Sequence, residues 1–214
     1  MASKIFTTHV GSLPRSKQLS ELLFSKDKKE SYDENEFKEI VKQNVEEVVK
    51  KQLNIGIDFI SDGEMSKISY ATYVKDRISG FSGESERKTP ADLEDFPEYM
   101  TKIAKSGGTP SYTRPCCTSD LAIQDTESLK DDVANLNNAI KKNNHSNAFM
   151  NAASPGVINV FMPNKFYQND DEYLEKLSDL MSLEYEYITS NNLQLQIDCP
   201  DLALARHMNY KDLS

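Results

Sequence analysis

Three carboxylates follow short hydrophobic segments of the sequence. Asp62 and Glu64 lie in the stretch SDGE, and Asp198 ends the stretch LQLQID directly before Cys199 and Pro200. A carboxylate at the end of a buried strand can hold an ammonium group through a charge-assisted hydrogen bond. Each also has a purely structural interpretation: an Asp-Gly turn with solvated side chains, or a helix N-cap. The pattern alone leaves both interpretations open.

Histidine, arginine and cysteine side chains offer further candidates. His9 lies near the end of the first predicted strand, where an imidazole could line a site. Arg114 could bind a carboxylate or a phosphate through two parallel hydrogen bonds. The cysteines, Cys116, Cys117 and Cys199, have neither a disulfide framework nor a usual zinc-ligand spacing. The sequence contains no P-loop, GxGxxG or GxSxG motif.

Amphipathic periodicity predicts three long helices, over 33–56, 127–142 and 170–192. In the first, apolar residues from Phe37 to Leu53 recur at spacings of three, four and one along one side. Ser31 with Glu34 predicts a capping box at its start, and Gly56 predicts its end. Shorter helical segments are expected over 69–80 and near 97–105, the latter within the weakly patterned region 82–112.

Predicted strands alternate with these helices. They cover 4–12, 56–64, 147–154 and 193–198, with one more inside 113–123. The first, which is rich in β-branched residues, is expected to be a short buried strand. Such alternation is typical of βα units and a parallel sheet, of which we count four or five. Four of the strands end on a polar or small residue, namely Ser12, Glu64, Ser154 and Asp198. Because functional groups gather at the carboxyl ends of parallel strands, these positions are site candidates.

Composition narrows the function classes. The 214 residues are enough for one domain with a core, and the formal net charge is −9. This acidic balance argues against nucleic acid or an anionic membrane surface as the main partner. No apolar run approaches the roughly 20 residues of a membrane span, and the N-terminus lacks a signal-peptide core. A reducing cytoplasm is therefore the expected location.

Four stretches in collinear order resemble the cobalamin-independent methionine synthase family. They are TTHVGSLPR, GIDFISDGEMSKISYATYVKDRISGF, FMNAASPGVINVFMPNKFY and LQLQIDCPDLALARH. The likeness is strongest to the short, single-barrel members, which resemble the carboxyl-terminal catalytic half of the long synthases. It implies a (β/α)8 barrel of the TIM type. It also implies methyl transfer from a methylated folate to the zinc-bound thiol of homocysteine, giving methionine.

The resemblance assigns roles residue by residue. Ser12 matches a serine that touches the amino-acid substrate, while Glu64 and Asp198 match the two carboxylates that bind its ammonium group. Arg114 matches loosely an arginine on the folate side, and His9 is added as a candidate substrate-binding residue from its place at a strand end. The sequence departs from the long synthases in having no tryptophan, which puts folate as the methyl donor in doubt.

A larger departure concerns the metal. The family's zinc ligands are His, Cys, Glu and Cys, and its His-x-Cys pair lies after the QIDCP region, yet no His-x-Cys occurs in these 214 residues. We therefore assign no metal ligand. A (β/α)8 barrel needs about 250 residues. The prediction is one partial barrel domain over 1–214, a truncated member with the first five to six βα units, inactive alone and covering its open edge as a homo-oligomer.

Two other functions stay open. Short barrels of this kind are similar to thiol alkyltransferases such as epoxyalkane:coenzyme M transferase. Keeping both Glu64 and Asp198 favours an amino-acid thiol, because coenzyme M has no amine for them to bind. The missing zinc ligands are also compatible with a non-catalytic binding protein that retains half a site.

Overall fold

Parallel segments form the centre of the computed structural model, which describes residues 4–86, 91–105 and 112–208. Thr8 bridges Phe59 and Ile60 bridges Ala148, both in parallel. Strand β3 (Phe149–Ala153) then pairs in parallel with β4 (Gln194–Asp198), in register from Phe149–Gln194 to Ala153–Asp198. The described residues thus hold four parallel segments in chain order, which do not close into a barrel. Five to six units were expected.

An antiparallel pair of strands accounts for the smaller number of parallel units. Strand β1 (Ile78–Ser82) pairs with β2 (Cys116–Ile123) outside the parallel series. The helix predicted over 69–80 is only a 3-10 helix, η1 (Thr72–Asp76), before β1 begins. Gly80 lies at a bulge in β1, where the register shifts between Ser79 and Phe81. It has φ +103, and an added Cβ would lie 2.9 Å from the backbone oxygens of Ser119 and Asp120. Only glycine fits this bulge without strain.

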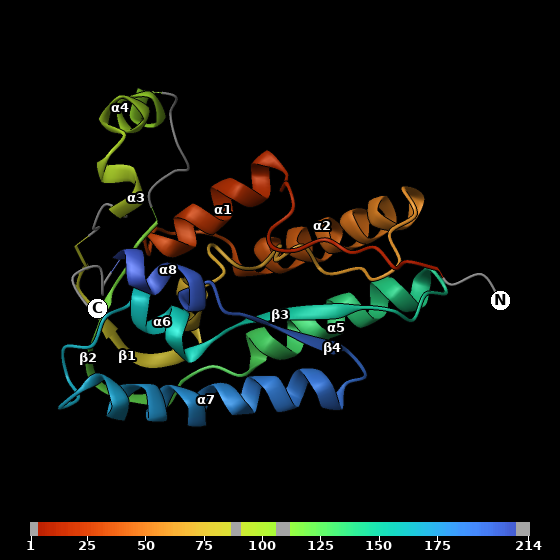
Figure 1. The fold of residues 1–214 in the computed structure, drawn as a ribbon. Coiled ribbons are helices and arrows are strands. Elements are labelled where there is room, and N and C mark those ends of the chain that lie inside the picture. The colour runs from red at the N-terminus through yellow and green to blue at the C-terminus, as the bar shows by residue number, and fades with distance from the viewer. Residues whose placement is uncertain (1–3, 87–90, 106–111, 209–214) are drawn as a thin grey trace.

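The helices surround the parallel segments, as Figure 1 shows for α2, α5 and α7 around β3 and β4. Short helices α3 (Ala91–Glu94) and α4 (Pro97–Lys105) project from this body. The other helices are α1 (Lys17–Asp27), α2 (Glu34–Asn54), α5 (Glu127–Lys142), α6 (Pro155–Phe161), α7 (Asp170–Ser190) and α8 (Asp201–Met208). No helix in the described part of the chain is long and apolar enough to cross a membrane.

Capping residues set the helix boundaries. The predicted capping box from Ser31 is wrong: the side chain of Asp33 accepts the backbone N–H groups of Asn35 and Glu36, so α2 begins at Glu34. A carboxylate at the N-cap satisfies these two donors itself. The predicted stop at Gly56 is confirmed. Its φ of +84 allows the reversed turn that ends the helix.

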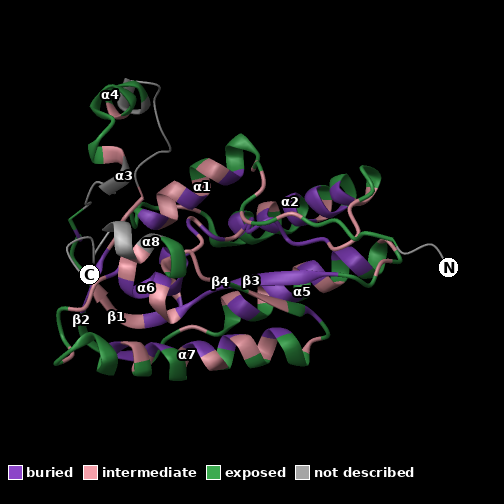
Figure 2. Cartoon of the chain, viewed as in Figure 1, coloured by how far each residue is buried: buried purple, intermediate pink, exposed green. Residues whose placement is uncertain are grey.

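The core lies between the helices and the parallel segments, and β3 is buried along its whole length (Figure 2). The first predicted strand is different. It was expected to be buried, yet Ile5, Phe6 and Val10 are 89%, 62% and 73% exposed. This segment has a parallel neighbour on only one side in the described residues, through Thr8. At the other end of the series Ile197 of β4 is also exposed. Both ends of the series therefore present apolar side chains to solvent.

Candidate active site

Ser12 and Glu64 meet at the ends of the first two parallel segments. The hydroxyl of Ser12 donates a hydrogen bond of 2.6 Å to Oε2 of Glu64. The backbone N–H of Leu13 also donates to the carbonyl oxygen of Gly63 at 3.0 Å, which ties the two loops together. Glu64 is fully buried, and its second oxygen, Oε1, has no hydrogen-bond partner. A buried carboxylate oxygen without a donor is costly, so this atom is suited to receive one from a ligand.

A constrained turn presents Glu64. The residue has φ +56, a left-handed conformation that is uncommon for glutamate and that occurs preferentially at functional sites. Asp62 accepts the backbone N–H of Glu64 at 3.0 Å. The guanidinium of Arg15 donates to the carbonyl oxygens of Glu64 and Lys67, each at 2.7 Å. The Asp-Gly turn expected from SDGE is thus present, but Asp62 is buried, and this burial raises the pKa of its carboxyl.

Asp198 stands at the end of β4 and is held from the neighbouring strand. The side-chain amide of Asn151 on β3 donates to both carboxylate oxygens at 3.1 Å, and Gln196 donates to Oδ1 at 3.1 Å. Helix α8 has its own acidic N-terminal residue, Asp201, which accepts the hydroxyl of Ser154 at 2.7 Å. The carboxylate of Asp198 therefore remains half-buried beside Asn151, available from the solvent side.

Aromatic side chains and Arg114 lie near the two carboxylates. Tyr70 packs edge-on against Phe161, with ring centroids 5.5 Å apart, and the Arg114 guanidinium lies 4.6 Å from the Phe161 ring. The pKa of Tyr70 is raised to about 12, mainly by burial; the nearby Tyr112, Asp198 and Glu64 also raise it, and Arg114 lowers it. The Tyr70 hydroxyl therefore stays protonated and available as a donor at neutral pH.

Arg114 has unused hydrogen-bonding capacity. Its side chain donates to the hydroxyl of Tyr112 at 3.3 Å, while its Nε is buried and has no partner. For His9, the described residues show one hydrogen bond, in which its carbonyl oxygen accepts from the hydroxyl of Thr8. Ser12, Glu64 and Asp198 follow neighbouring parallel segments at one end of the series. The role of His9 stays a prediction.

A buried network of charged side chains stabilises the elements next to this cluster. Arg77 contacts Asp132 of α5 at 2.5 Å and Glu184 of α7 at 2.9 Å. The hydroxyl of Tyr73 donates to Glu184 at 2.6 Å and accepts the backbone N–H of Ala153 at 3.3 Å. Burial alone lowers the pKa of Arg77, but the adjacent carboxylates outweigh it and the net shift is upward. The network connects the η1 segment, two helices and the end of β3.

Lys67 extends this network to the strand that carries Asn151. Its ammonium group donates to the backbone oxygen of Asn151 at 2.5 Å and lies 4.4 Å from the ring of Tyr73. The side chain is only 2% exposed. The backbone of β3 is therefore fixed by Lys67 and Tyr73 independently of the side chain of Asn151.

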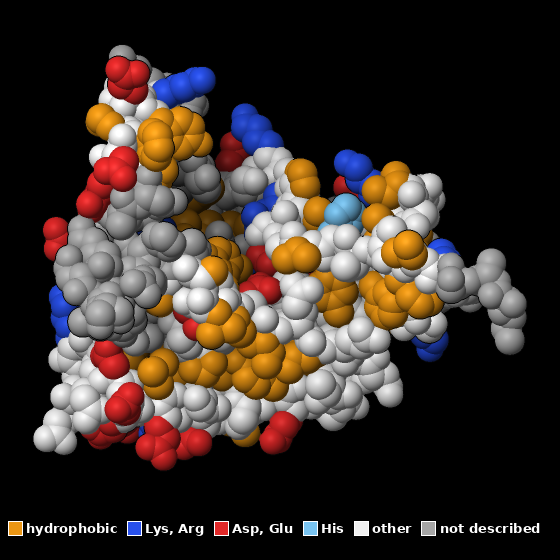
Figure 3. Space-filling model, viewed as in Figure 1, with side chains coloured by type: hydrophobic (Ala, Val, Ile, Leu, Met, Phe, Trp, Pro, Cys, Tyr) orange, Lys and Arg blue, Asp and Glu red, His pale blue; other side chains and the backbone are white. Residues whose placement is uncertain are grey.

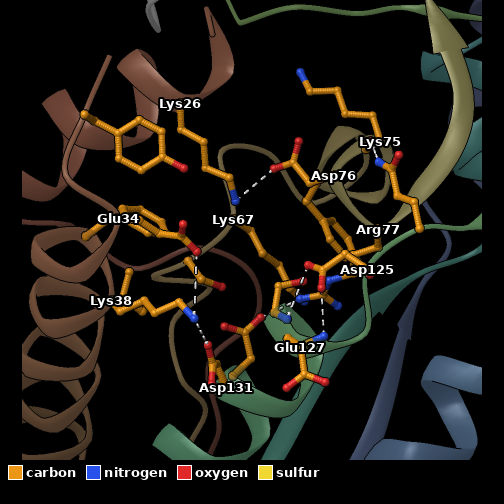
Figure 4. A pocket seen from close by; sticks show the side chains of 18 of the residues that line it. Lys26, Glu34, Lys38, Lys67, Lys75, Asp76, Arg77, Asp125, Glu127 and Asp131 are labelled. Atoms are coloured by element: carbon orange, nitrogen blue, oxygen red, sulfur yellow. Dashed lines mark hydrogen bonds and ion pairs between the residues drawn. The ribbon is translucent and has the colours of Figure 1, made fainter. Parts of the chain in front are cut away.

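A cavity of about 740 Å³ lies elsewhere, between α1, α2, η1 and α5, and neither Glu64 nor Asp198 lines it. Several of its charged side chains pair with one another, as Figure 4 shows. Lys26 lies 3.2 Å from Asp76, and Lys38 lies 3.0 Å from Asp131. These pairs partly neutralise the charge that the cavity could offer a substrate. We place the candidate site at the carboxylates instead.

The residues of the cluster do not suit zinc. No group of three or more His, Cys, Asp or Glu side chains in the described part of the chain is placed to hold a metal ion. Glu64 already accepts a hydrogen bond from Ser12, and Asp198 accepts one from Asn151. The cysteine next to Asp198 in the sequence is Cys199. Zinc prefers several sulfur and nitrogen ligands arranged tetrahedrally. No chemical step is therefore assigned here to a metal.

Comparison with known proteins supports the fold and the family resemblance. The family model "Cobalamin-independent synthase, Catalytic domain" matches residues 5–90. A B12-independent methionine synthase from Shewanella sp. W3-18-1, solved in complex with selenomethionine, is 16% identical with a TM-score of 0.65. A Listeria monocytogenes protein assigned to the vitamin B12-independent methionine synthases is also 16% identical, with a TM-score of 0.55. No curated protein sequence matches the chain significantly.

The two solved structures are matched over only part of their length. The matches cover 91% and 92% of this chain but 51% and 52% of the solved chains, so this chain spans about half their length. The predicted fold class, an incomplete (β/α)8 barrel, is confirmed. The predicted resemblance to the cobalamin-independent methionine synthase family is also confirmed, and the family model covers both Ser12 and Glu64.

Sequence reasoning missed three residues of the cluster. Arg15 lies in the quoted TTHVGSLPR stretch, where its basic side chain after the Gly-Ser turn was a usable signal. Asn151 interrupts the apolar strand FMNAA, and a polar residue in a buried strand is an informative exception. Tyr70 carried no signal, because a tyrosine in a segment of mixed character is most often part of the core.

Proposed function

We propose that this chain, which carries the catalytic-domain pattern of the cobalamin-independent methionine synthases, binds an amino acid of the methionine type through Glu64 and Asp198. The observation that carries the proposal is the buried oxygen Oε1 of Glu64, which has no hydrogen-bond partner. A second carboxylate, Asp198, lies at the same end of the parallel segments. Two carboxylates around one ammonium group compensate its loss of water. Ser12 orients Glu64, and Asn151 orients Asp198.

The proposed reaction class is S-methyl transfer. The sulfur of homocysteine would lose its proton and form a bond to the methyl carbon, while the bond between that carbon and the nitrogen of a methylated folate, the proposed donor, breaks. A proton is returned to that nitrogen, so that the sum of the reaction moves the thiol proton to the folate. The side chains of this chain bind and orient the amino acid. Phe161 and Tyr70 exclude water beside it, and Arg114 presents a cation to an anionic part of the second substrate. The two carboxylates favour this class over transfer to coenzyme M, which has no amine.

In the family, zinc activates the thiol. The residues described in this chain do not fit such a site. We therefore propose that residues 1–214, taken as one partial barrel domain, bind the amino acid without holding zinc and without transferring methyl groups alone. Metal analysis of the purified chain that found one zinc per protein would contradict this.

Titration of the purified chain with L-methionine tests the proposal. We expect saturable binding in the calorimeter, at one amino acid per chain. The deaminated analogue, in which a hydroxyl replaces the ammonium group, is expected to bind at least tenfold more weakly because it offers no cation to the carboxylates. Absence of binding, or equal affinity for both compounds, would overturn the proposal.

We also propose that two copies of the chain associate through the ends of the parallel series. Ile5, Phe6 and Val10 at one end and Ile197 at the other are exposed, and hydrophobic side chains gather on this face of the molecule (Figure 3). Unpaired strand edges favour pairing with another chain, and a second copy supplies parallel partners to both ends. Light scattering should report a dimer. A monomer that fails to bind a hydrophobic dye would contradict the proposal.

A further inference from the structure

The orientation of the Asn151 amide follows from its neighbour. Both oxygens of Asp198 lie 3.1 Å from the amide nitrogen of Asn151. A carboxylate accepts hydrogen bonds, so the nitrogen must face Asp198 and the amide oxygen must point elsewhere. That oxygen, Oδ1, is buried and has no hydrogen-bond partner, and the residue is only 2% exposed. The amide thus leaves an acceptor free.

A second buried acceptor without a partner follows the neighbouring parallel segment. It is Oε1 of Glu64. Asp198, on the other side, accepts from Asn151 and Gln196 but keeps lone pairs for further donors. Glu64, Asn151 and Asp198 lie on three consecutive parallel segments, joined by the pairing of Ile60 with Ala148 and of β3 with β4. Each of three neighbouring parallel segments therefore carries one acceptor side chain, within it or at its end.

A primary ammonium group has three N–H donors, which is the number of these acceptors. We propose that Asn151 is the third acceptor of the ammonium site and that it restricts the site to primary amines. The inference rests on the proposed function, since it specifies the substrate class of the same site. A secondary or tertiary ammonium ion keeps the charge but loses one or two donors. It would leave Oδ1 of Asn151 or a carboxylate oxygen unpaired in a buried place.

The side chain of Asn151 is not needed to hold its strand. Lys67 binds the backbone oxygen of Asn151 at 2.5 Å, and Tyr73 binds the backbone N–H of Ala153. A leucine at 151 would fill a similar volume and avoid an unpaired buried oxygen. The cost of leaving that oxygen unpaired in the unliganded chain is thus better explained by a ligand than by the fold.

The test compares L-methionine with its N-methyl and N,N-dimethyl derivatives, titrated into the wild-type chain, Asn151→Leu and the control Asn137→Leu. Asn137 is half-buried on α5 and donates to the backbone oxygen of Asn191, away from the site. The wild-type chain and the control should prefer methionine over N-methylmethionine by about 10- to 100-fold. Asn151→Leu should bind methionine more weakly and reduce this preference to below about threefold.

The outcomes separate the two proposals. If methionine binds, and Asn151→Leu keeps the full preference, the role of Asn151 is overturned while the proposed function stands. If the wild-type chain does not bind methionine, both are overturned. Should Asn151→Leu fail to fold, the wild-type series decides: a loss of affinity at each added methyl group supports the inference, and equal affinities overturn it.

Discussion

Replacing Glu64 with glutamine should weaken methionine binding by about 100-fold or more, because one charge-assisted hydrogen bond is lost and a buried amide then faces the ammonium group. Glutamine keeps the size of the side chain and can still accept the Ser12 hydroxyl, so the fold should be retained. Calorimetric titration of the variant, alongside its urea unfolding curve, measures both quantities. The expected result is lost binding with little change in the free energy of unfolding.

Two further variants sharpen this test. Ser12→Ala should weaken binding less, by about tenfold, because it removes only the hydroxyl that orients Glu64. Glu98→Gln, on the exposed side of α4, is the matched charge control and should bind as the wild type does. Equal affinity of Glu64→Gln and Glu98→Gln for methionine would contradict the assignment of Glu64.

Replacing Arg77 with methionine should lower the free energy of unfolding by about 3–5 kcal/mol. The change leaves Glu184 and Asp132 buried without their cation, since Arg77 is only 6% exposed and contacts both. Urea unfolding at neutral pH measures the loss. Lys38→Met is the matched control: its pairs with Glu34 and Asp131 are half exposed, and its loss should cost below about 1 kcal/mol.

The pH dependence of the free energy of unfolding tests whether the ion pairs of Arg77 cause this loss. Burial raises the pKa of Glu184, but Arg77 and Lys67 outweigh it, so the folded-state pKa lies below the usual value of 4.5. A depressed carboxyl pKa contributes stability above the unfolded value, and this contribution is lost as pH falls through the folded value. The other partner, Asp132, has a raised pKa because its burial outweighs the opposing charge of Arg77, so this pH dependence is assigned to Glu184. The wild-type advantage over Arg77→Met should therefore be largest near neutral pH and shrink below about pH 4. An advantage that stayed constant with pH, or one below about 1 kcal/mol at pH 7, would contradict the role given to Arg77.

Much of the candidate site followed from a rule about strand ends. Ser12, Glu64 and Asp198 were predicted because each follows a hydrophobic segment, and the structure places all three at the same end of the parallel series. Their roles remain predictions. The rule works because parallel strands share one direction, so residues far apart in sequence meet at one edge. His9 satisfied the same rule, but its side chain has no hydrogen bond to these residues in the described part of the chain, so its role also remains a prediction.

Other features depend on partners that the local sequence does not specify. The segment 69–80 has enough helical character to suggest a helix, yet β1 forms because β2 supplies hydrogen bonds from about 40 residues away. The first strand was read as buried from its β-branched residues. Burial is set by what covers a strand, and here the covering neighbour is present on one side only. The proposed role of Asn151 depends on its hydrogen bond to Asp198 on the next strand, which the local sequence does not predict.

A crystal of this chain grown with selenomethionine would show most directly whether Glu64 and Asp198 bind the amino group, since anomalous scattering locates the selenium and the density then places the amino group. We expect the ammonium nitrogen to lie within about 3.2 Å of Glu64 Oε1 and of a carboxylate oxygen of Asp198. A selenomethionine bound at another place, or one whose carboxylate rather than ammonium group faces Glu64, would contradict it.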